Sequence, residues 1–199
     1  MPDRKIFRPL FWVLLALCLA WASPALATDY VHPASKLVFP YKIAGMERDV
    51  ITKFANTGLG VGISYKGGPG KAFADVYIYD GGLAQIRDDC LAPEIKREFE
   101  TGNGAISRHA KKVHYQGFRE LGLRKIFLGQ KGGGRCAWEA RYEYEVGQGE
   151  KVIKRSFFVL TAKRDRFIKL RFTTIAPRWD NWPDHYNKFL EELGRILEQ

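Results

Sequence analysis

Eight glycines lie between Gly58 and Gly82, and their spacing resembles that of a nucleotide-binding loop. Such loops cradle phosphates with backbone N–H groups at the N-terminus of a helix. The P-loop pattern fails, because Tyr65 stands where that motif needs its first glycine and Ala72 follows the lysine. The dinucleotide fingerprint fails at Ile63, and the residues that follow alternate as in a strand. We therefore predict a β-hairpin whose turn is formed by Gly67, Gly68, Pro69 and Gly70.

Histidines and carboxylates are the other candidates for catalysis or metal binding. His109 and His114 are five residues apart, which places them on different faces of a helix. Asp75 and Asp80 could be the paired carboxylates of a hydrolase, but alternation along a strand places them on opposite sides. Neither a His-Glu-x-x-His nor a Gly-x-Ser-x-Gly motif is present in the sequence. We therefore expect no catalytic residue, no metal ion and no cofactor.

The first 27 residues have the three parts of a secretory signal peptide. Basic residues come first, an apolar run extends from Leu10 to Trp21, and Ala25-Leu26-Ala27 forms a cleavage site. An uncleaved membrane anchor is the alternative, although the run is shorter than the roughly 20 residues of a membrane span. We expect cleavage after Ala27 and a periplasmic product with no transmembrane segment. Residues 28–199 would form a single domain.

Export changes the interpretation of the cysteines. Cys18 would leave with the signal peptide, so Cys90 and Cys136 remain. Two cysteines in an oxidising compartment favour one disulfide. The alternative is an unpaired loop cysteine at position 90 and a buried strand cysteine at position 136.

The composition and the hydrophobic periodicity predict an α+β fold. The chain is 46% hydrophobic and 14% aromatic, which is not a disordered composition. We predict a twisted antiparallel sheet of about six or seven strands with helices packed on it. A first short strand is expected around Leu37 to Tyr41, and two helical segments are expected within 90–117 and 181–199. Gly102 and Gly104 would weaken the first helical segment, giving either two helices or one with a break.

The alternating pattern of residues 136–147 predicts a half-buried strand, with one apolar buried face and one charged exposed face. Cysteine, tryptophan, alanine, tyrosine and valine alternate there with Glu139, Arg141, Glu143 and Glu145. The following residues, 151–163 and 167–174, predict two further strands of the same sheet.

Two groups of residues are candidates for binding a ligand or a partner. The first is the face of the strand formed by Phe73, Asp75, Tyr77 and Tyr79, which is either buried core or an exposed groove. The second is the basic hairpin, with Lys163, Arg164, Arg166, Lys169 and Arg171. An exported protein seldom meets nucleic acid, so an anionic surface or an acidic envelope protein fits these charges better. The alternative is that Arg155, Lys169 and Arg171 form cross-strand ion pairs with Glu139, Glu143 and Glu145.

The segments "GMERDVITKFANTGLGVGISY", "ADVYIYDGG" and "RDRFIKLRFTT" resemble those of a family of uncharacterised exported proteins of Proteobacteria. The last segment and its strand–turn–strand–helix order also resemble the photosystem II extrinsic-protein (PsbP-like) fold. That resemblance implies an antiparallel sheet between helices, from about Leu37 to the end, and an accessory or binding role without catalysis. An unrelated α+β sandwich is the alternative fold.

The sequence thus predicts an exported accessory or interaction protein of the cell envelope. The second hypothesis is a protein that binds a small or anionic ligand in a groove between sheet and helix. A hydrolase is the third.

Overall fold

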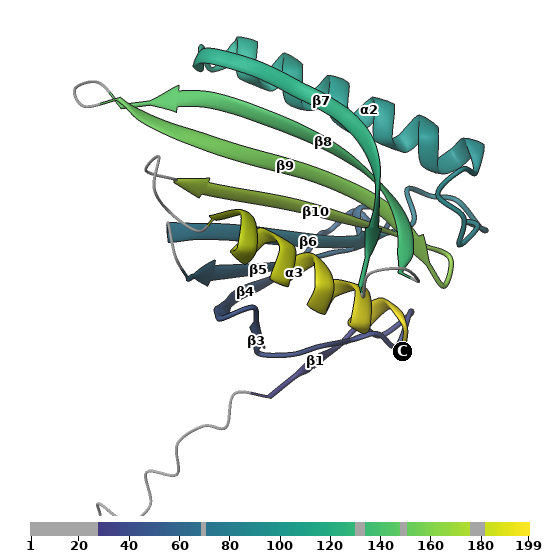
Figure 1. Cartoon of the computed structure of the whole chain (residues 1–199). Coiled ribbons are helices and arrows are strands. Elements are labelled where there is room, and N and C mark those ends of the chain that lie inside the picture. The colour runs from purple at the N-terminus through teal and green to yellow at the C-terminus, as the bar shows by residue number, and fades with distance from the viewer. Residues whose placement is uncertain (1–27, 69–70, 130–133, 148–150, 176–181) are drawn as a thin grey trace, which may run out of the picture.

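The computed structural model describes residues 28–68, 71–129, 134–147, 151–175 and 182–199, without the side chain of Trp182. The predicted signal peptide, Pro69 and Gly70 therefore lie outside the described residues. Two helices and an eight-stranded sheet form the body of the protein (Figure 1). Every neighbouring pair of strands in this sheet is antiparallel. The α+β class and the antiparallel sheet are thus confirmed.

The sheet has the strand order β3-β4-β5-β6-β10-β9-β8-β7. Its strands are β3 (Lys42–Ile43), β4 (Met46–Lys53), β5 (Val61–Gly67), β6 (Ala72–Tyr79), β7 (Gln116–Leu128), β8 (Arg135–Val146), β9 (Val152–Lys163) and β10 (Arg166–Ile175). A separate two-stranded sheet joins β1 (Tyr30–Val31) to β2 (Val38–Phe39), and a 3-10 helix, η1, covers Thr57–Leu59. The main sheet has more strands than the predicted six or seven. The expected first strand around Leu37 to Tyr41 corresponds to β2, which belongs to the separate two-stranded sheet, and the edge strand β3 is too short to show a period.

The glycine-rich stretch forms two paired strands, as the predicted hairpin requires, whereas half of its predicted turn, Pro69 and Gly70, lies outside the described residues. β5 pairs antiparallel with β6, from Val61 opposite Ile78 to Gly67 opposite Ala72. Gly60 precedes β5 with a positive φ of 64°, and a Cβ atom there would lie 2.0 Å from the carbonyl oxygen of Ile78. Glycine is needed at this position because two backbones approach each other.

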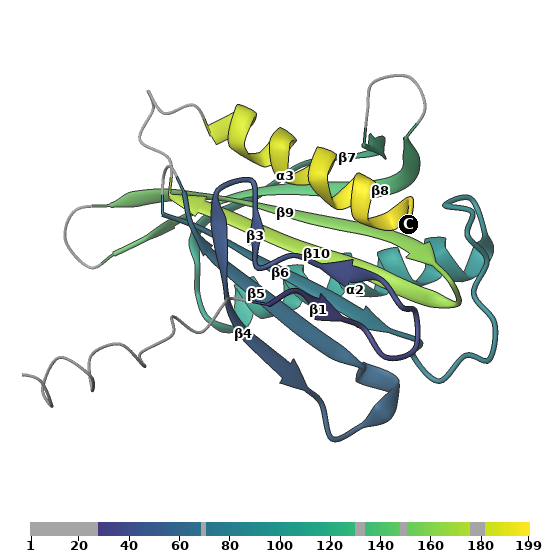
Figure 2. The ribbon, with the colours of Figure 1, turned by 90° about the horizontal axis from the view of Figure 1, so that it is seen from below.

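Helix α3 (Trp182–Leu197) and the N-terminal strands cover one face of the sheet, and helix α2 (Pro93–Lys112) covers the other (Figure 2). We call these the α3 face and the α2 face. On the α3 face, alternate residues of β6 and β10 pack against the apolar side of α3; Val76, Ile78, Leu170, Phe172, Phe189 and Leu193 are all buried there. On the α2 face, Ile95 and Phe99 of the helix pack on Phe158 and Leu160 of β9.

Helix α2 is continuous through Gly102 and Gly104, so both predicted alternatives, two helices or one helix with a break, are wrong. The apolar stripe is buried at Ile95, Phe99 and Ala110, whereas Val113 lies beyond the helix and is 41% exposed. Within the described residues, no helix is both long and apolar enough to cross a membrane.

Strand β8 is covered on both faces, so the prediction of a half-buried strand is wrong. Glu139 is fully buried and accepts a hydrogen bond from the hydroxyl of Tyr186 in α3 at 2.7 Å. Arg124 of β7 donates to the same carboxylate at 2.7 Å. Alternation alone could not reveal this cover, since a buried glutamate with two donors has the same sequence pattern as an exposed one.

Candidate functional site

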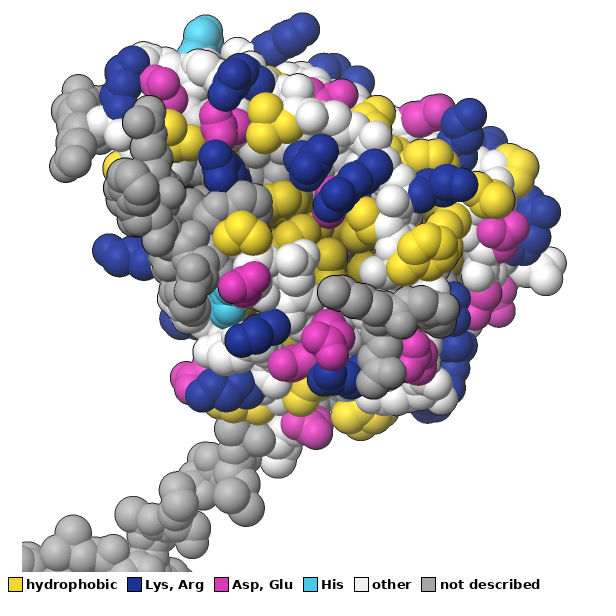
Figure 3. Space-filling view, viewed as in Figure 1, with side chains coloured by type: hydrophobic (Ala, Val, Ile, Leu, Met, Phe, Trp, Pro, Cys, Tyr) yellow, Lys and Arg dark blue, Asp and Glu magenta, His cyan; other side chains and the backbone are white. Residues whose placement is uncertain are grey.

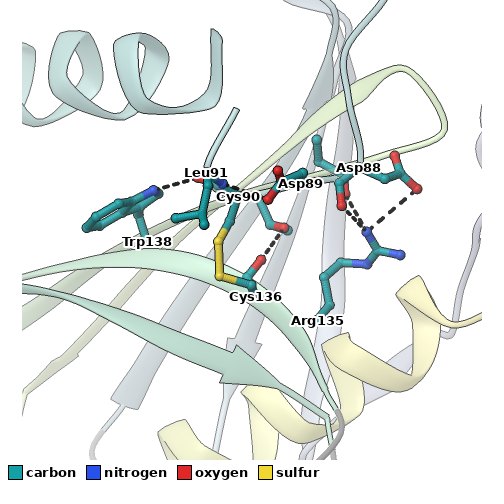
Figure 4. The surroundings of a disulfide bond; sticks show 9 residues. Asp88, Asp89, Cys90, Leu91, Arg135, Cys136 and Trp138 are labelled. Carbon is teal, nitrogen blue, oxygen red and sulfur yellow. Dashed lines mark hydrogen bonds and ion pairs between the residues drawn. A yellow bond between two sulfur atoms is a disulfide. The ribbon is translucent and has the colours of Figure 1, made fainter. Parts of the chain in front are cut away.

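The start of helix α2 is fixed to the sheet by a disulfide between Cys90 and Cys136 (Figure 4). This confirms the predicted pairing. The indole N–H of Trp138 donates to the carbonyl of Cys90 at 2.8 Å, and the guanidinium of Arg135 lies 3.6 Å from the carboxylate of Asp88. The loop before α2 is therefore held to β8 by covalent, hydrogen-bonded and ionic contacts together.

The middle of α2 lies close to the sheet because it carries small side chains. A Cβ atom on Gly102 would lie 2.6 Å from the Cζ atom of Phe158, closer than such atoms approach in folded proteins. Gly102 therefore allows the helix to pack on the ring of Phe158. Farther along the helix, Ala105 and Ala110 are too short to fill the space above the sheet, and a pocket opens between helix and strands.

The pocket has a volume of about 440 Å³ and combines apolar, aromatic and charged walls. Helix α2 contributes Gly102, Ala105, Ile106, His109 and Ala110. The sheet contributes residues of β6 to β10 and the segment just before β7, among them Asp75, Tyr77, Tyr115, Phe118, Tyr142, Tyr144, Ser156, Phe158, Lys169, Arg171 and Thr173. A concave site of this size and mixed lining is typical of small-molecule sites.

Arg171 is the first of two cations that line the pocket. Its Nη2 atom donates to the hydroxyl of Ser156 at 3.1 Å. Its Nε atom is buried and has no hydrogen-bond partner among the described residues. Asp75 lies opposite Arg171 in the β6–β10 register, but no ion pair joins them within 4.0 Å. Asp75 instead accepts a hydrogen bond from Ser64 at 2.5 Å.

Lys169 is the second cation of the pocket. Its amine lies 4.6 Å from the ring centroid of Tyr77 and 5.2 Å from that of Tyr79. Burial lowers the pKa of Lys169, and the positive charge of Arg171 acts in the same direction, while the carboxylate of Glu98 opposes it. Lys169 and Arg171 together with the single lining carboxylate, Asp75, give the described pocket a positive balance.

One wall of the pocket is a group of aromatic rings. Tyr115 stacks on Tyr144 with ring centroids 4.5 Å apart, and His109 meets Tyr115 edge-on at 6.1 Å. Phe118 stacks on Tyr142 at 5.7 Å. Burial raises the pKa values of Tyr142 and Tyr144, so both phenols stay neutral at physiological pH and can donate hydrogen bonds.

The four candidate residues of β6 separate into different environments. Phe73 is 51% exposed, Asp75 and Tyr77 line the pocket, and Tyr79 is buried with its hydroxyl donating to Glu98 at 2.6 Å. The face is thus neither wholly core nor wholly surface. It changes along the strand because α2 covers only part of it.

The five basic candidates lie in two separate places. Lys169 and Arg171 line the pocket, whereas Lys163, Arg164 and Arg166 lie at the β9–β10 turn and are engaged within the protein. The amine of Lys163 lies 3.9 Å from Asp88, and a guanidinium nitrogen of Arg166 lies 3.5 Å from Asp80. Arg164 donates to the carbonyls of Ser35 and Gln199. In Figure 3, basic side chains alternate with acidic and hydrophobic ones instead of gathering in one patch on that face.

Cross-strand ion pairs were predicted for Arg155, Lys169 and Arg171. The prediction is confirmed for Arg155 and wrong for Lys169 and Arg171. Arg155 lies opposite Glu143 and donates to it at 3.0 Å. Lys169 and Arg171 point to the α2 face, whereas Glu139 and Glu143 point to the α3 face. The prediction failed because it assumed a common face for strands whose relative register was unknown.

The sequence also missed several pocket residues. Tyr142 and Tyr144 line the pocket, although the pattern of residues 136–147 predicts only a half-buried strand, and Gly102 lines it, although the sequence marks it only as a weak point of the helix. A usable signal was present: small residues at positions 102 and 105 lie on a helix that packs against a strand rich in tyrosine. In the described part of the chain, no group of three or more His, Cys, Asp or Glu side chains could hold a metal ion.

No protein-family model matches the chain, and no curated protein matches it. Among solved structures, a match covers 84% of this chain and 93% of PA94, a Pseudomonas aeruginosa protein of unknown function with a suggested regulatory role. The two share 17% identity with a TM-score of 0.37, and this likeness carries no argument about fold or function.

Proposed function

We propose that the protein binds a small anionic molecule with an apolar or aromatic body in the pocket beneath α2. The observation that carries this proposal is the pair of cations, Lys169 and Arg171, that lines the pocket with Asp75 as the single lining carboxylate, while no carboxylate of the described residues forms an ion pair with either of them. Charged groups withdrawn from water are normally paired or hydrogen-bonded, so two cations without an ion-pair partner favour an anion. A carboxylate, sulfonate or phosphate of a ligand in the pocket would accept hydrogen bonds from the guanidinium of Arg171.

The other walls of the pocket support both parts of this ligand. Lys169 adds a second positive charge beside Arg171, and Ser156 and Thr173 add hydroxyls whose oxygens lie 3.1 Å apart. The stacked rings of Tyr115 and Tyr144 and the side chain of Ile106 offer an apolar surface for the ligand's body. Aromatic rings flanking a charged anchor favour ligands that are flat and amphipathic.

This proposal places ligand binding ahead of a docking role for the basic hairpin. The charges of Lys163, Arg164 and Arg166 contact groups of the protein itself, so the turn offers less unpaired charge than the sequence indicated. We keep docking to an acidic envelope protein or an anionic surface as a second role, which the protein would perform with its ligand bound. A hydrolase is less well supported, because Asp75 is the single carboxylate lining the described pocket.

We further propose that the protein is exported to the periplasm after cleavage at Ala27, and that it is an uncharacterised exported protein with a PsbP-like sandwich fold. The Cys90–Cys136 disulfide supports export, since structural disulfides persist mainly in oxidising compartments. The two helices on opposite faces of one antiparallel sheet support the sandwich arrangement.

The charge requirement can be tested with two fluorescent probes of similar shape. 8-Anilinonaphthalene-1-sulfonate is anionic, whereas N-phenyl-1-naphthylamine lacks the sulfonate. We expect the mature protein to bind the anionic probe, and Arg171→Gln to weaken this binding by about 10- to 100-fold, as the loss of a charge-assisted hydrogen bond implies. Binding of the neutral probe should change little.

Arg155→Gln is the matched control, because Arg155 is paired with Glu143 on the opposite face. Near-UV circular dichroism should show that both variants keep native tertiary packing. Equal affinity of the wild type and Arg171→Gln for the anionic probe would contradict the proposed site.

A further inference from the structure

The amine of Lys169 has an unusual environment for a lysine. Two tyrosine rings lie beside it, at 4.6 Å and 5.2 Å from the ring centroids, and it lines the pocket. Among the described residues, no carboxylate lies within ion-pair distance of the amine, and none accepts a hydrogen bond from it. By contrast, Lys42, Lys66 and Lys151 each have a carboxylate within 3.1 Å.

The position of Lys169 relative to Arg171 is fixed by the strand that carries both. They alternate on one face of β10, so their Cα atoms are about 7 Å apart. A small ligand whose anionic group is held by Arg171 therefore has its far end near the amine of Lys169. Both side chains are held in register by the neighbouring strands, since Lys169 lies between Tyr77 and Leu160 and Arg171 lies between Asp75 and Phe158.

Two roles fit a cation at this place. Lys169 could be a second counter-ion, or its amine could act as a nucleophile. A counter-ion needs only charge, which arginine supplies without losing its proton. A nucleophilic lysine needs its unprotonated form, which desolvation and a nearby second cation promote. Lys169 has both features, because its side chain is largely withdrawn from water and lies two residues from Arg171 on the same face. The tyrosine rings and the carboxylate of Glu98 act in the other direction and favour the ammonium, but burial is the larger effect.

We propose that Lys169 captures the carbonyl group of an anionic aldehyde or ketone as an imine, with Arg171 holding the ligand's anionic group. This inference rests on the proposed binding function and names the class of ligand. The lone pair of Nζ attacks the carbonyl carbon and gives a carbinolamine. Loss of the two nitrogen-bound hydrogens with the carbonyl oxygen releases one water and leaves the C=N bond, so no oxidant or reductant is needed. Hydrolysis reverses the step and returns the ligand.

The imine can be trapped with 4-formylbenzoate and sodium cyanoborohydride, followed by mass spectrometry of the intact protein and of its peptides. We expect reductive labelling at Lys169 to be about tenfold or more faster than at Lys125, which is exposed on β7, because Arg171 would hold the aldehyde beside the amine of Lys169. Lys169→Arg keeps the positive charge and should lose this fast labelling, whereas Lys125→Arg should keep it.

4-Methylbenzaldehyde has the carbonyl but no anionic group, and should label Lys169 about tenfold or more slowly than 4-formylbenzoate does. Equal labelling by the two aldehydes, or slow labelling spread over exposed lysines, overturns the inference. If 4-formylbenzoate displaces 8-anilinonaphthalene-1-sulfonate but does not label Lys169 preferentially, imine capture is wrong and anion binding stands. If it neither displaces the probe nor labels Lys169, and the probe also binds Arg171→Gln as tightly as the wild type, the proposed binding function fails as well.

Discussion

The two faces of the same sheet are packed in opposite ways. On the α3 face, Phe189 meets the rings of Tyr65 and Phe172 at centroid distances of 6.0 Å and 5.8 Å, and the interior is closed. On the α2 face, the helix presents Ala105 and Ala110 to charged and aromatic strand residues, and a pocket remains. Large side chains on a helix fill the space above a sheet, while small ones leave it open.

Buried polar groups lie on both faces. Glu139 on the α3 face is fully buried, and it receives hydrogen bonds from Tyr186 and Arg124. The Nε atoms of Arg141 on the α3 face and of Arg171 on the α2 face are both buried without a hydrogen bond among the described residues, but Arg141 lies 3.6 Å from the carboxylate of Glu139. The faces therefore differ in charge balance, because the cations around Glu139 have a carboxylate beside them, whereas Lys169 and Arg171 line a pocket without one in ion-pair distance.

The largest expected effect comes from removing one phenylalanine ring from each face. Phe189→Ala should lower the free energy of unfolding by about 3–5 kcal/mol, because Phe189 is fully buried and its loss leaves a cavity. Phe118→Ala should cost about 1–2 kcal/mol, because Phe118 lies half-buried at a pocket that is already open. Urea denaturation of both variants measures the difference, and similar losses would contradict the contrast between the faces.

A smaller effect should appear along α2 itself. Gly102→Ala would place a methyl group 2.6 Å from the Cζ atom of Phe158, so the helix or the ring must shift. We expect a net loss of about 1–2 kcal/mol, since strain outweighs the better helix propensity of alanine. Gly104→Ala meets only the flexible end of Arg108 and should stabilise the protein by about 0.5–1 kcal/mol. Urea denaturation of both variants tests this: the unfolding midpoint should fall for Gly102→Ala and rise for Gly104→Ala. A stabilised Gly102→Ala variant would show that the close approach of the helix to Phe158 is not needed.

The long strands and both helices could be predicted because their periods are regular. Alternation identified β6, β8 and β10, and the spacing of apolar residues identified α2 and α3. Strands β1, β2 and β3 have two residues each and show no period, so the strand count was too low. The disulfide could be predicted because only two cysteines follow the predicted signal peptide, and export would bring them into an oxidising compartment.

The site could be predicted only in part, because a pocket depends on which strands become neighbours. Tyr77, Lys169 and Arg171 were all named from the sequence, but as members of two unrelated groups. β6 and β10 are separated by more than 80 residues in the chain and adjoin in the sheet, which brings Lys169 directly opposite Tyr77. Strand order is a tertiary property that no local period reports.

The smallest effect is a pH dependence that should have opposite directions on the two faces. Glu143 on the α3 face accepts hydrogen bonds from Arg119 at 2.5 Å and Arg155 at 3.0 Å, and these lower its pKa, with Arg119 the larger cause. A carboxyl whose folded pKa is lowered adds stability above its unfolded pKa and loses it as the pH falls through the folded value. Glu143→Gln should therefore cost about 1 kcal/mol or less at neutral pH, and this cost should begin to fade near the unfolded pKa of about 4.3 and be lost as the pH falls through the lower folded pKa.

Lys169 gives the opposite case, because burial lowers the pKa of a group that carries its charge when protonated. The folded state then binds this proton less tightly than the unfolded state, so the penalty is present at neutral pH and fades as the pH rises toward the unfolded value. Lys169→Met should be slightly more stable than the wild type near pH 7, with the gain shrinking in alkaline solution. Both trends can be measured by urea denaturation of Glu143→Gln and Lys169→Met between pH 3 and pH 10. The unfolding midpoint of each variant is compared with that of the wild type at the same pH. If Lys169→Met were instead less stable than the wild type near pH 7, with a loss that shrank in alkaline solution, Lys169 would be stabilised in its charged form, and the α2 face would resemble the α3 face in its electrostatics.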